Sequence, residues 1–140
     1  MKKKSLLLLI LPVMTVILEL LPWGVVLNFA NPEGEPYRRT YSYFSLTPYG
    51  YANFSPFITA LLTCAILILI FTYIAKPRSV LYKVISLISI IAFIISLAPL
   101  LYGIRNFTVI GAFISVLLLL HCCLIFIIRK VLEDKNEESK

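Results

Sequence analysis

The sequence has little charge: Asp, Glu, Lys and Arg make up only 14% of its 140 residues, whereas hydrophobic residues make up 60%. Soluble globular domains carry roughly 25% charged residues and about 45–50% apolar ones. One soluble core could not bury so many Leu, Ile and Phe side chains. The composition therefore excludes a multidomain soluble enzyme and indicates an integral membrane protein.

The sequence also lacks the residue patterns of common catalytic and metal sites. It contains no HExxH, no GxSxG, no glycine-rich phosphate loop and no paired carboxylates, so we expect no enzyme activity. Its three cysteines, Cys64, Cys122 and Cys123, all lie in apolar runs, which excludes a disulfide framework in an external loop. His121 precedes two of them, but consecutive helical residues point about 100° apart and cannot all face one ion. We therefore expect neither a metal nor a cofactor.

Four apolar runs are long enough to cross a membrane. A hydrocarbon core of about 30 Å needs roughly 20 helical residues at about 1.5 Å each. The predicted spans cover residues 6–27, 57–75, 84–102 and 107–128. Residues 28–56 then form an external loop, and residues 129–140 form a cytoplasmic tail. We expect an all-α fold in which four transmembrane helices form one compact bundle and a single domain.

Basic residues gather on one side of these spans. Of 13 Lys and Arg residues, only Arg38, Arg39 and Arg105 fall in the predicted outer loops. Cytoplasmic segments retain positive charge, so both termini should be cytoplasmic. The net charge of +6 follows from this topology, and we expect no nucleic-acid partner. Short loops and abundant Lys and Ile favour a multi-pass protein of a bacterial plasma (inner) membrane.

The basic, apolar start of the chain also has the pattern of a secretory signal. Against cleavage, its apolar run exceeds the usual length of about 7–15 residues, and no A-x-A-like site follows. We therefore count it as a span.

The predicted external loop is rich in tyrosine. Proline and glycine over 31–36 favour a turn, and alternating Tyr and Thr follow over 37–46. We expect a short β-hairpin in this second half, with its turn at 48–50. Exposed aromatic side chains offer large contact area at low entropic cost, so the candidate partner-binding residues are Tyr41, Tyr43, Tyr49 and Tyr51. The alternative is an aromatic belt that rests on the lipid headgroups.

Two ionisable side chains deep in the predicted spans are candidates for ion or proton coupling. If the first helix continues through Pro22, Glu19 lies roughly 12 Å below Leu27, while His121 lies about 21 Å below Phe107. This difference in depth argues against direct contact. An ionised carboxylate in hydrocarbon costs several kcal/mol and is usually retained for a reason, so Glu19 is a candidate functional site. The alternative for Glu19 is a structural, neutral carboxyl group bonded to a neighbouring helix.

Small residues predict which spans approach closely. Ser89, Ala92 and Ser96 follow helical spacing in the third span, and Gly111 and Ser115 do so in the fourth. Small side chains let helix backbones come together in a membrane. We expect these two spans to pack as an antiparallel pair.

These observations favour a small polytopic protein that acts as an accessory, assembly or interaction protein. Its expected partners are the lipid bilayer and either another membrane protein or a second copy of the chain. The alternative function is a small oligomeric transporter or channel that uses Glu19.

Overall fold

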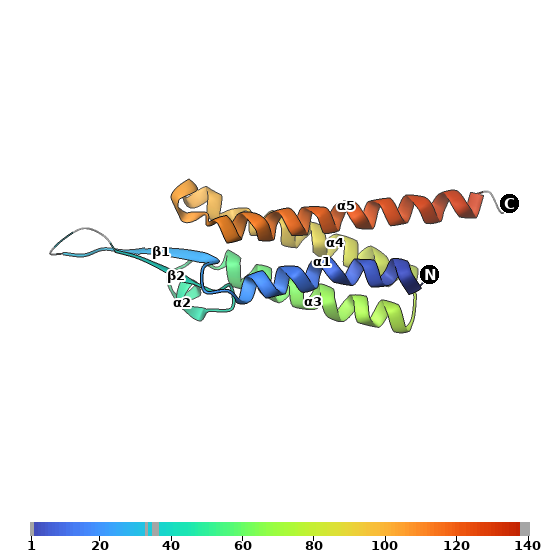
Figure 1. The fold of residues 1–140 in the computed structure, drawn as a ribbon, viewed down its shortest axis with the longest axis horizontal. Helices are drawn as coiled ribbons and strands as arrows, with labels where there is room; N and C mark the ends of the chain where they lie inside the picture. The colour runs from blue at the N-terminus through green and yellow to red at the C-terminus, as the bar shows by residue number, and fades with distance from the viewer. Residues whose placement is uncertain (1, 33, 35–36, 138–140) are drawn as a thin grey trace.

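The computed structural model describes residues 2–32, 34 and 37–137 and is mostly helical, with a small sheet at one end (Figure 1). Residues 138–140 of the predicted tail lie outside the described residues. In chain order the elements are α1 (Lys2–Leu20), β1 (Val25–Phe29), β2 (Tyr37–Tyr41), α2 (Leu46–Gly50), α3 (Ser55–Ala75), α4 (Ser79–Ser96), the 3-10 helices η1 (Ala98–Tyr102) and η2 (Ile104–Asn106), and α5 (Val109–Glu137). We call α1, α3, α4 and α5 the helical body.

Three helical segments are long and apolar enough to cross a membrane: Ser55–Ala75, Ser79–Leu101 and Val109–Lys130. They match the second, third and fourth predicted spans. The first has 21 residues, or about 31 Å at the α-helical rise, close to a hydrocarbon core of about 30 Å. In α1 the apolar stretch Leu7–Leu20 is shorter.

The helices of the body lie side by side (Figure 1). α1 contacts α3 and α5, and α4 contacts the same two helices. Their core is aliphatic and includes the fully buried Ile66, Ile70, Ile85, Ile114 and Leu118. Many outward-facing side chains are also large and apolar, such as Ile68 on α3 and Leu87 on α4. Such an outer surface suits lipid rather than water.

The close approach predicted for the third and fourth spans is confirmed. Helices α4 and α5 are in contact, and the hydroxyl of Ser96 donates to that of Ser115 across their interface at 2.9 Å. Both serines are buried. Small side chains thus bring the backbones together and satisfy each other's polar groups.

The predicted end of the first span is wrong. α1 ends at Leu20 rather than at residue 27, and β1 already begins at Val25. Pro22 explains the break, because proline disfavours helix at the preceding residue and has no backbone N–H to donate. Val25 and Val26 are buried in strand β1. Because they are apolar, they continued the apolar run of the first helix, and the prediction included them in that span.

A hairpin is present, but not with the predicted pairing. β1 pairs antiparallel with β2, from Val25↔Tyr41 to Phe29↔Tyr37. The connection therefore falls in the stretch 30–36, and the predicted turn at 48–50 lies in α2 instead. The Ser45 side chain accepts a hydrogen bond from the Thr47 N–H at the start of that helix, a typical N-cap. The prediction missed β1, because residues 25–27 were assigned to the first span and residues 28–29 to the start of the loop.

Candidate functional site

The described residues from 21 to 54 form a cap on one end of the helical body. The register of its hairpin sorts side chains onto two faces, since neighbours along a strand alternate. One face carries Val26, Asn28, Arg38 and Thr40, and the other carries Leu27, Phe29, Tyr37 and Arg39. We call the second set, with Tyr51, the aromatic face.

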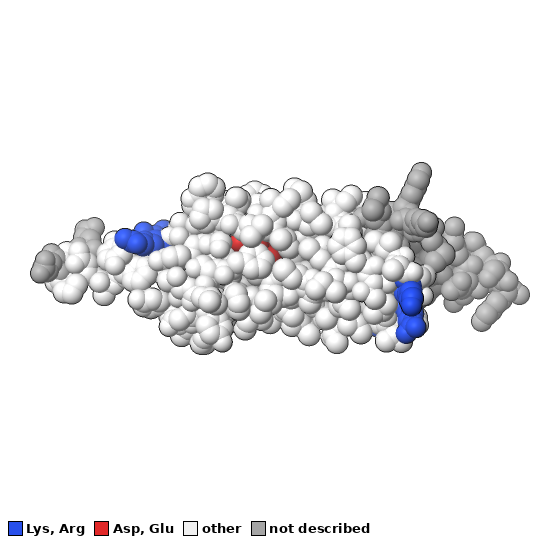
Figure 2. All heavy atoms as spheres, turned by 90° about the horizontal axis from the view of Figure 1, so that it is seen from below, with Lys and Arg blue, Asp and Glu red and all other residues white. Residues whose placement is uncertain are grey.

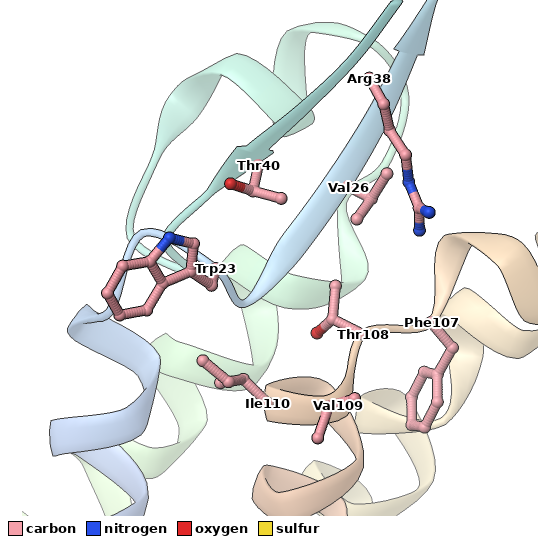
Figure 3. A pocket seen from close by; sticks show the side chains of 8 residues that line it. All are labelled: Trp23, Val26, Arg38, Thr40, Phe107, Thr108, Val109 and Ile110. Atoms are coloured by element: carbon pink, nitrogen blue, oxygen red, sulfur yellow. The ribbon is translucent and has the colours of Figure 1, made fainter.

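The first face forms one wall of an open groove of about 430 Å³. The start of α5 forms the facing wall, and Trp23 stands at one end (Figure 3). The lining residues are Trp23, Val26, Arg38, Thr40, Phe107, Thr108, Val109 and Ile110.

Three polar contacts fix the walls of this groove relative to each other. The Thr108 hydroxyl donates to the Gly24 carbonyl oxygen at 2.6 Å. The Asn28 side-chain amide donates to the side-chain oxygen of Asn106 at 2.8 Å. The Arg38 guanidinium donates to the carbonyl oxygen of Arg105. The hairpin is therefore tied to the segment that leads into α5.

The aromatic face is preorganised by ring contacts. Phe29 stacks on Tyr37 with ring centroids 5.2 Å apart and forms a T-shaped pair with Tyr51 at 5.3 Å. The Arg39 guanidinium lies 5.6 Å from the centroid of Tyr37, within cation–π range. Tyr37 is 48% exposed and Tyr51 is 63% exposed. The face thus combines rings that pack on one another with exposed ring surface.

The four predicted tyrosines do not share one surface. Tyr51 belongs to the aromatic face, whereas Tyr49 packs against Phe54 and Phe57 at the start of α3. Tyr41 is half-buried against the core, and Tyr43 is only 1% exposed. Sequence reasoning missed Phe29 and Tyr37, although Tyr37 begins the alternating Tyr/Thr run that indicated a strand.

Tyr43 joins the cap to the helical body. Its backbone N–H donates to the Glu19 carbonyl oxygen in the last turn of α1 at 2.9 Å. Its ring fills the space beside Gly24, and its hydroxyl lies close to Gly111 on α5. Burial raises the pKa of the Tyr43 phenol, so the group remains neutral. Tyr43 is therefore a core residue that holds three segments together.

Glu19 is fully buried beneath this cap. Its Oε1 accepts a hydrogen bond from the Thr63 hydroxyl at 2.9 Å, while the same hydroxyl lies 3.0 Å from the Thr59 carbonyl oxygen. A hydroxyl has one proton and cannot fully serve both acceptors. A neutral Glu19 that donates from Oε1 to Thr63 would satisfy the whole chain of hydrogen bonds. The other oxygen, Oε2, has no hydrogen-bond partner among the described residues.

The depth predicted for Glu19 assumed a helix that continues to Leu27. Glu19 instead lies in the last turn of α1. Its partner Thr63 is eight residues into α3, which begins at Ser55, or about 12 Å from that end by the helical rise. Glu19 is therefore buried at the end of α1, where its side chain faces α3 and its carbonyl oxygen accepts a hydrogen bond from the cap residue Tyr43.

His121 occupies a separate polar site. Its Nδ1 lies 3.2 Å from the Ser89 hydroxyl oxygen, and that hydroxyl is 2.7 Å from the Ile85 carbonyl oxygen. If Ser89 donates to Ile85, it accepts from His121, which places the imidazole proton on Nδ1. Glu19 bonds to α3 and His121 to α4, and no hydrogen bond joins the two in the described part of the chain.

Within residues 2–32, 34 and 37–137, no group of three His, Cys, Asp or Glu side chains could hold a metal ion. Comparison with known proteins finds no matching family model, no matching curated protein and no matching solved structure. The candidate functional features of the chain are therefore the aromatic face, the groove and the buried Glu19.

Proposed function

We propose that this chain is a multi-pass plasma-membrane protein in which α1, α3, α4 and α5 form a four-helix transmembrane bundle. The apolar stretch of α1, Leu7–Leu20, covers about 21 Å by the helical rise, and α1 packs beside α3 and α5, two of the helices long enough to span. In the face that Figure 2 shows, Lys and Arg side chains gather near the two ends and none lies between them. Short loops and abundant Lys and Ile favour a bacterial membrane.

Both termini are proposed to be cytoplasmic. α1 begins and α5 ends at the end of the molecule opposite the hairpin (Figure 1). By their positions in the sequence, ten of the 13 Lys and Arg residues belong to the end of the molecule that holds the termini. The other three, Arg38, Arg39 and Arg105, lie in the cap or in η2. The positive-inside rule then places the cap outside the cell.

We propose that the protein acts through binding, as an accessory or assembly protein of the membrane. The aromatic face carries this proposal, because its rings pack on one another, Tyr37 and Tyr51 are exposed, and the hairpin that bears most of the face projects beyond the helical body (Figure 1). Tyr and Arg are enriched among the residues that dominate binding energy at interfaces. Packing them before binding lowers the entropy lost on association. The proposed partner is another membrane protein or a second copy of this chain.

Photo-crosslinking of the full-length chain in its native membrane tests this function. A photoreactive phenylalanine analogue at position 37 or 51 should give one protein adduct, whose mass separates a second copy from a different protein. The same analogue at position 40, on the opposite face of the hairpin, should give none. Adducts to lipid alone would instead favour the aromatic-belt interpretation, and equal protein adducts from all three positions would contradict a specific face.

Replacing Tyr37 and Tyr51 together with serine should weaken the captured complex. A residue that dominates an interface typically contributes about 2 kcal/mol or more, which is roughly a 30-fold change in Kd. Tyr49→Ser is the matched control, because Tyr49 is exposed but packs on Phe54 and Phe57 instead. The measurement is the amount of complex retained after purification in mild detergent. Equal loss in the control variant would contradict the assignment of this face.

A second candidate function is proton-coupled transport through Glu19, favoured by the unpartnered Oε2 of this fully buried carboxyl group. Glu19→Gln keeps the size and the hydrogen bond to Thr63 but cannot exchange a proton. If Glu19 couples transport, proton flux into vesicles loaded with a pH-sensitive dye should fall to the level of empty vesicles. Unchanged flux in Glu19→Gln would refute this function.

A further inference from the structure

The groove between the hairpin and α5 lies where α5 enters its apolar stretch. That stretch begins at Val109, which is itself a groove residue. Val109, Phe113 and Val116 are all exposed and follow at spacings of four and three residues, so they share one face of the helix. The apolar wall of the groove therefore continues as an apolar strip along α5 toward the middle of the membrane.

The mouth of the groove carries positive charge. Arg38 projects from β2 toward the wall that holds Phe107 (Figure 3). Its guanidinium donates to the Arg105 carbonyl oxygen, which orients it and leaves further N–H groups for another acceptor. The start of α5, in the facing wall, adds the partial positive charge of a helix N-terminus.

Hydrogen-bond donors in the groove, with an apolar strip that continues from it along α5, match an amphiphile with an anionic head. Guanidinium groups bind phosphate oxygens in a planar, two-pronged geometry. Trp23 and Thr40 add an indole N–H and a hydroxyl at the other end of the groove (Figure 3), and indole rings favour the headgroup level of a bilayer. A soluble anion would leave the adjoining apolar strip unused.

We propose that this groove binds an anionic phospholipid of the surrounding membrane. The phosphate lies at Arg38, and an acyl chain runs along Val109, Phe113 and Val116. The site is distinct from the aromatic face, because Arg38 and Arg39 point to opposite sides of the hairpin. The cap would thus be held by lipid on one face while the other remains free for a partner.

Trp23 makes the site directly measurable, because it is the only tryptophan in the chain. The full-length protein is reconstituted in phosphatidylcholine vesicles that contain either brominated phosphatidylglycerol or brominated phosphatidylcholine. At equal mole fractions, the brominated phosphatidylglycerol should bind about fivefold more strongly, as judged by quenching of Trp23 fluorescence. Equal quenching by the two lipids would overturn the proposal.

Two arginine variants distinguish the site from general attraction between the cap and the membrane. Arg38→Gln should abolish the preference for phosphatidylglycerol, while quenching by brominated phosphatidylcholine stays unchanged and reports an intact cap. Arg39→Gln removes the same charge from the opposite face and should keep the preference. Equal loss in both variants would overturn the proposal, as would displacement of the brominated lipid by millimolar inorganic phosphate.

Discussion

Replacing Tyr43 with alanine is expected to lower the free energy of unfolding by about 3–5 kcal/mol, the usual cost of truncating a large aromatic side chain in a packed core. Tyr43 is 1% exposed, and its ring touches the turn after α1 while its hydroxyl lies beside α5. Truncation leaves a cavity that these rigid backbones cannot close. Thermal unfolding of the purified protein in detergent, followed by circular dichroism, measures the effect.

Two further variants control for the chemistry of the change. Tyr43→Phe keeps the ring and loses only the hydroxyl, so its cost should stay below about 1.5 kcal/mol. Tyr49→Ala removes an exposed tyrosine of the same cap and should cost clearly less than Tyr43→Ala. If Tyr43→Ala were no more destabilising than Tyr49→Ala, Tyr43 would not be the residue that joins the cap to the helical body.

Tyr43 also links the two candidate functions. Its backbone N–H donates to the Glu19 carbonyl oxygen, so the cap is attached to α1 at the residue that transport would use. Proton coupling needs a path from the buried carboxyl group to water, which movement of the cap relative to α1 could open. Transport through Glu19 would require such movement, whereas a binding role for the aromatic face is served best by a cap that stays fixed.

Most of the helices could be predicted from the sequence because hydropathy and small-residue spacing are local patterns. Charge-free apolar runs define three helices long enough to span a membrane, and the small residues Ser96 and Ser115 identify a close helix pair. The end of the first span was predicted wrongly because Val25 and Val26 are buried in a sheet at the end of the helical body and do not belong to a helix. Hydropathy alone does not distinguish a buried strand from the continuation of a helix.

The candidate site was harder to predict from the sequence because it depends on contacts between segments that are distant along the chain. Glu19 was identified by the cost of a carboxyl group in an apolar run, but its partner Thr63 is 44 residues away. Tyr alternation indicated a strand, yet it could not show that Tyr43, just beyond that strand, turns inward. Predicting the groove would have required knowing that Val25 pairs with Phe107, and no local sequence pattern indicates a pairing between such distant residues.

Gly24→Ala is expected to destabilise the protein by about 1–3 kcal/mol through overpacking. A Cβ atom at this position would lie 2.7 Å from Cδ1 of the Tyr43 ring, which is too close for either group to stay in place. The ring has little room to move, because its hydroxyl lies against Gly111. The backbone at Gly24 is also held, since its carbonyl oxygen accepts the hydrogen bond from Thr108.

Gly50→Ala is the matched control, because a Cβ atom there would meet nothing within 4 Å, and it should leave the unfolding temperature nearly unchanged. The decisive measurement is a double-mutant cycle with Tyr43→Leu, whose smaller side chain makes room for the added methyl group. We expect Gly24→Ala to cost less in that background, with a coupling of about 0.5–3 kcal/mol. Strictly additive effects would mean that the methyl group and the ring do not meet, and that Gly24 is required for its backbone rather than for the space it leaves.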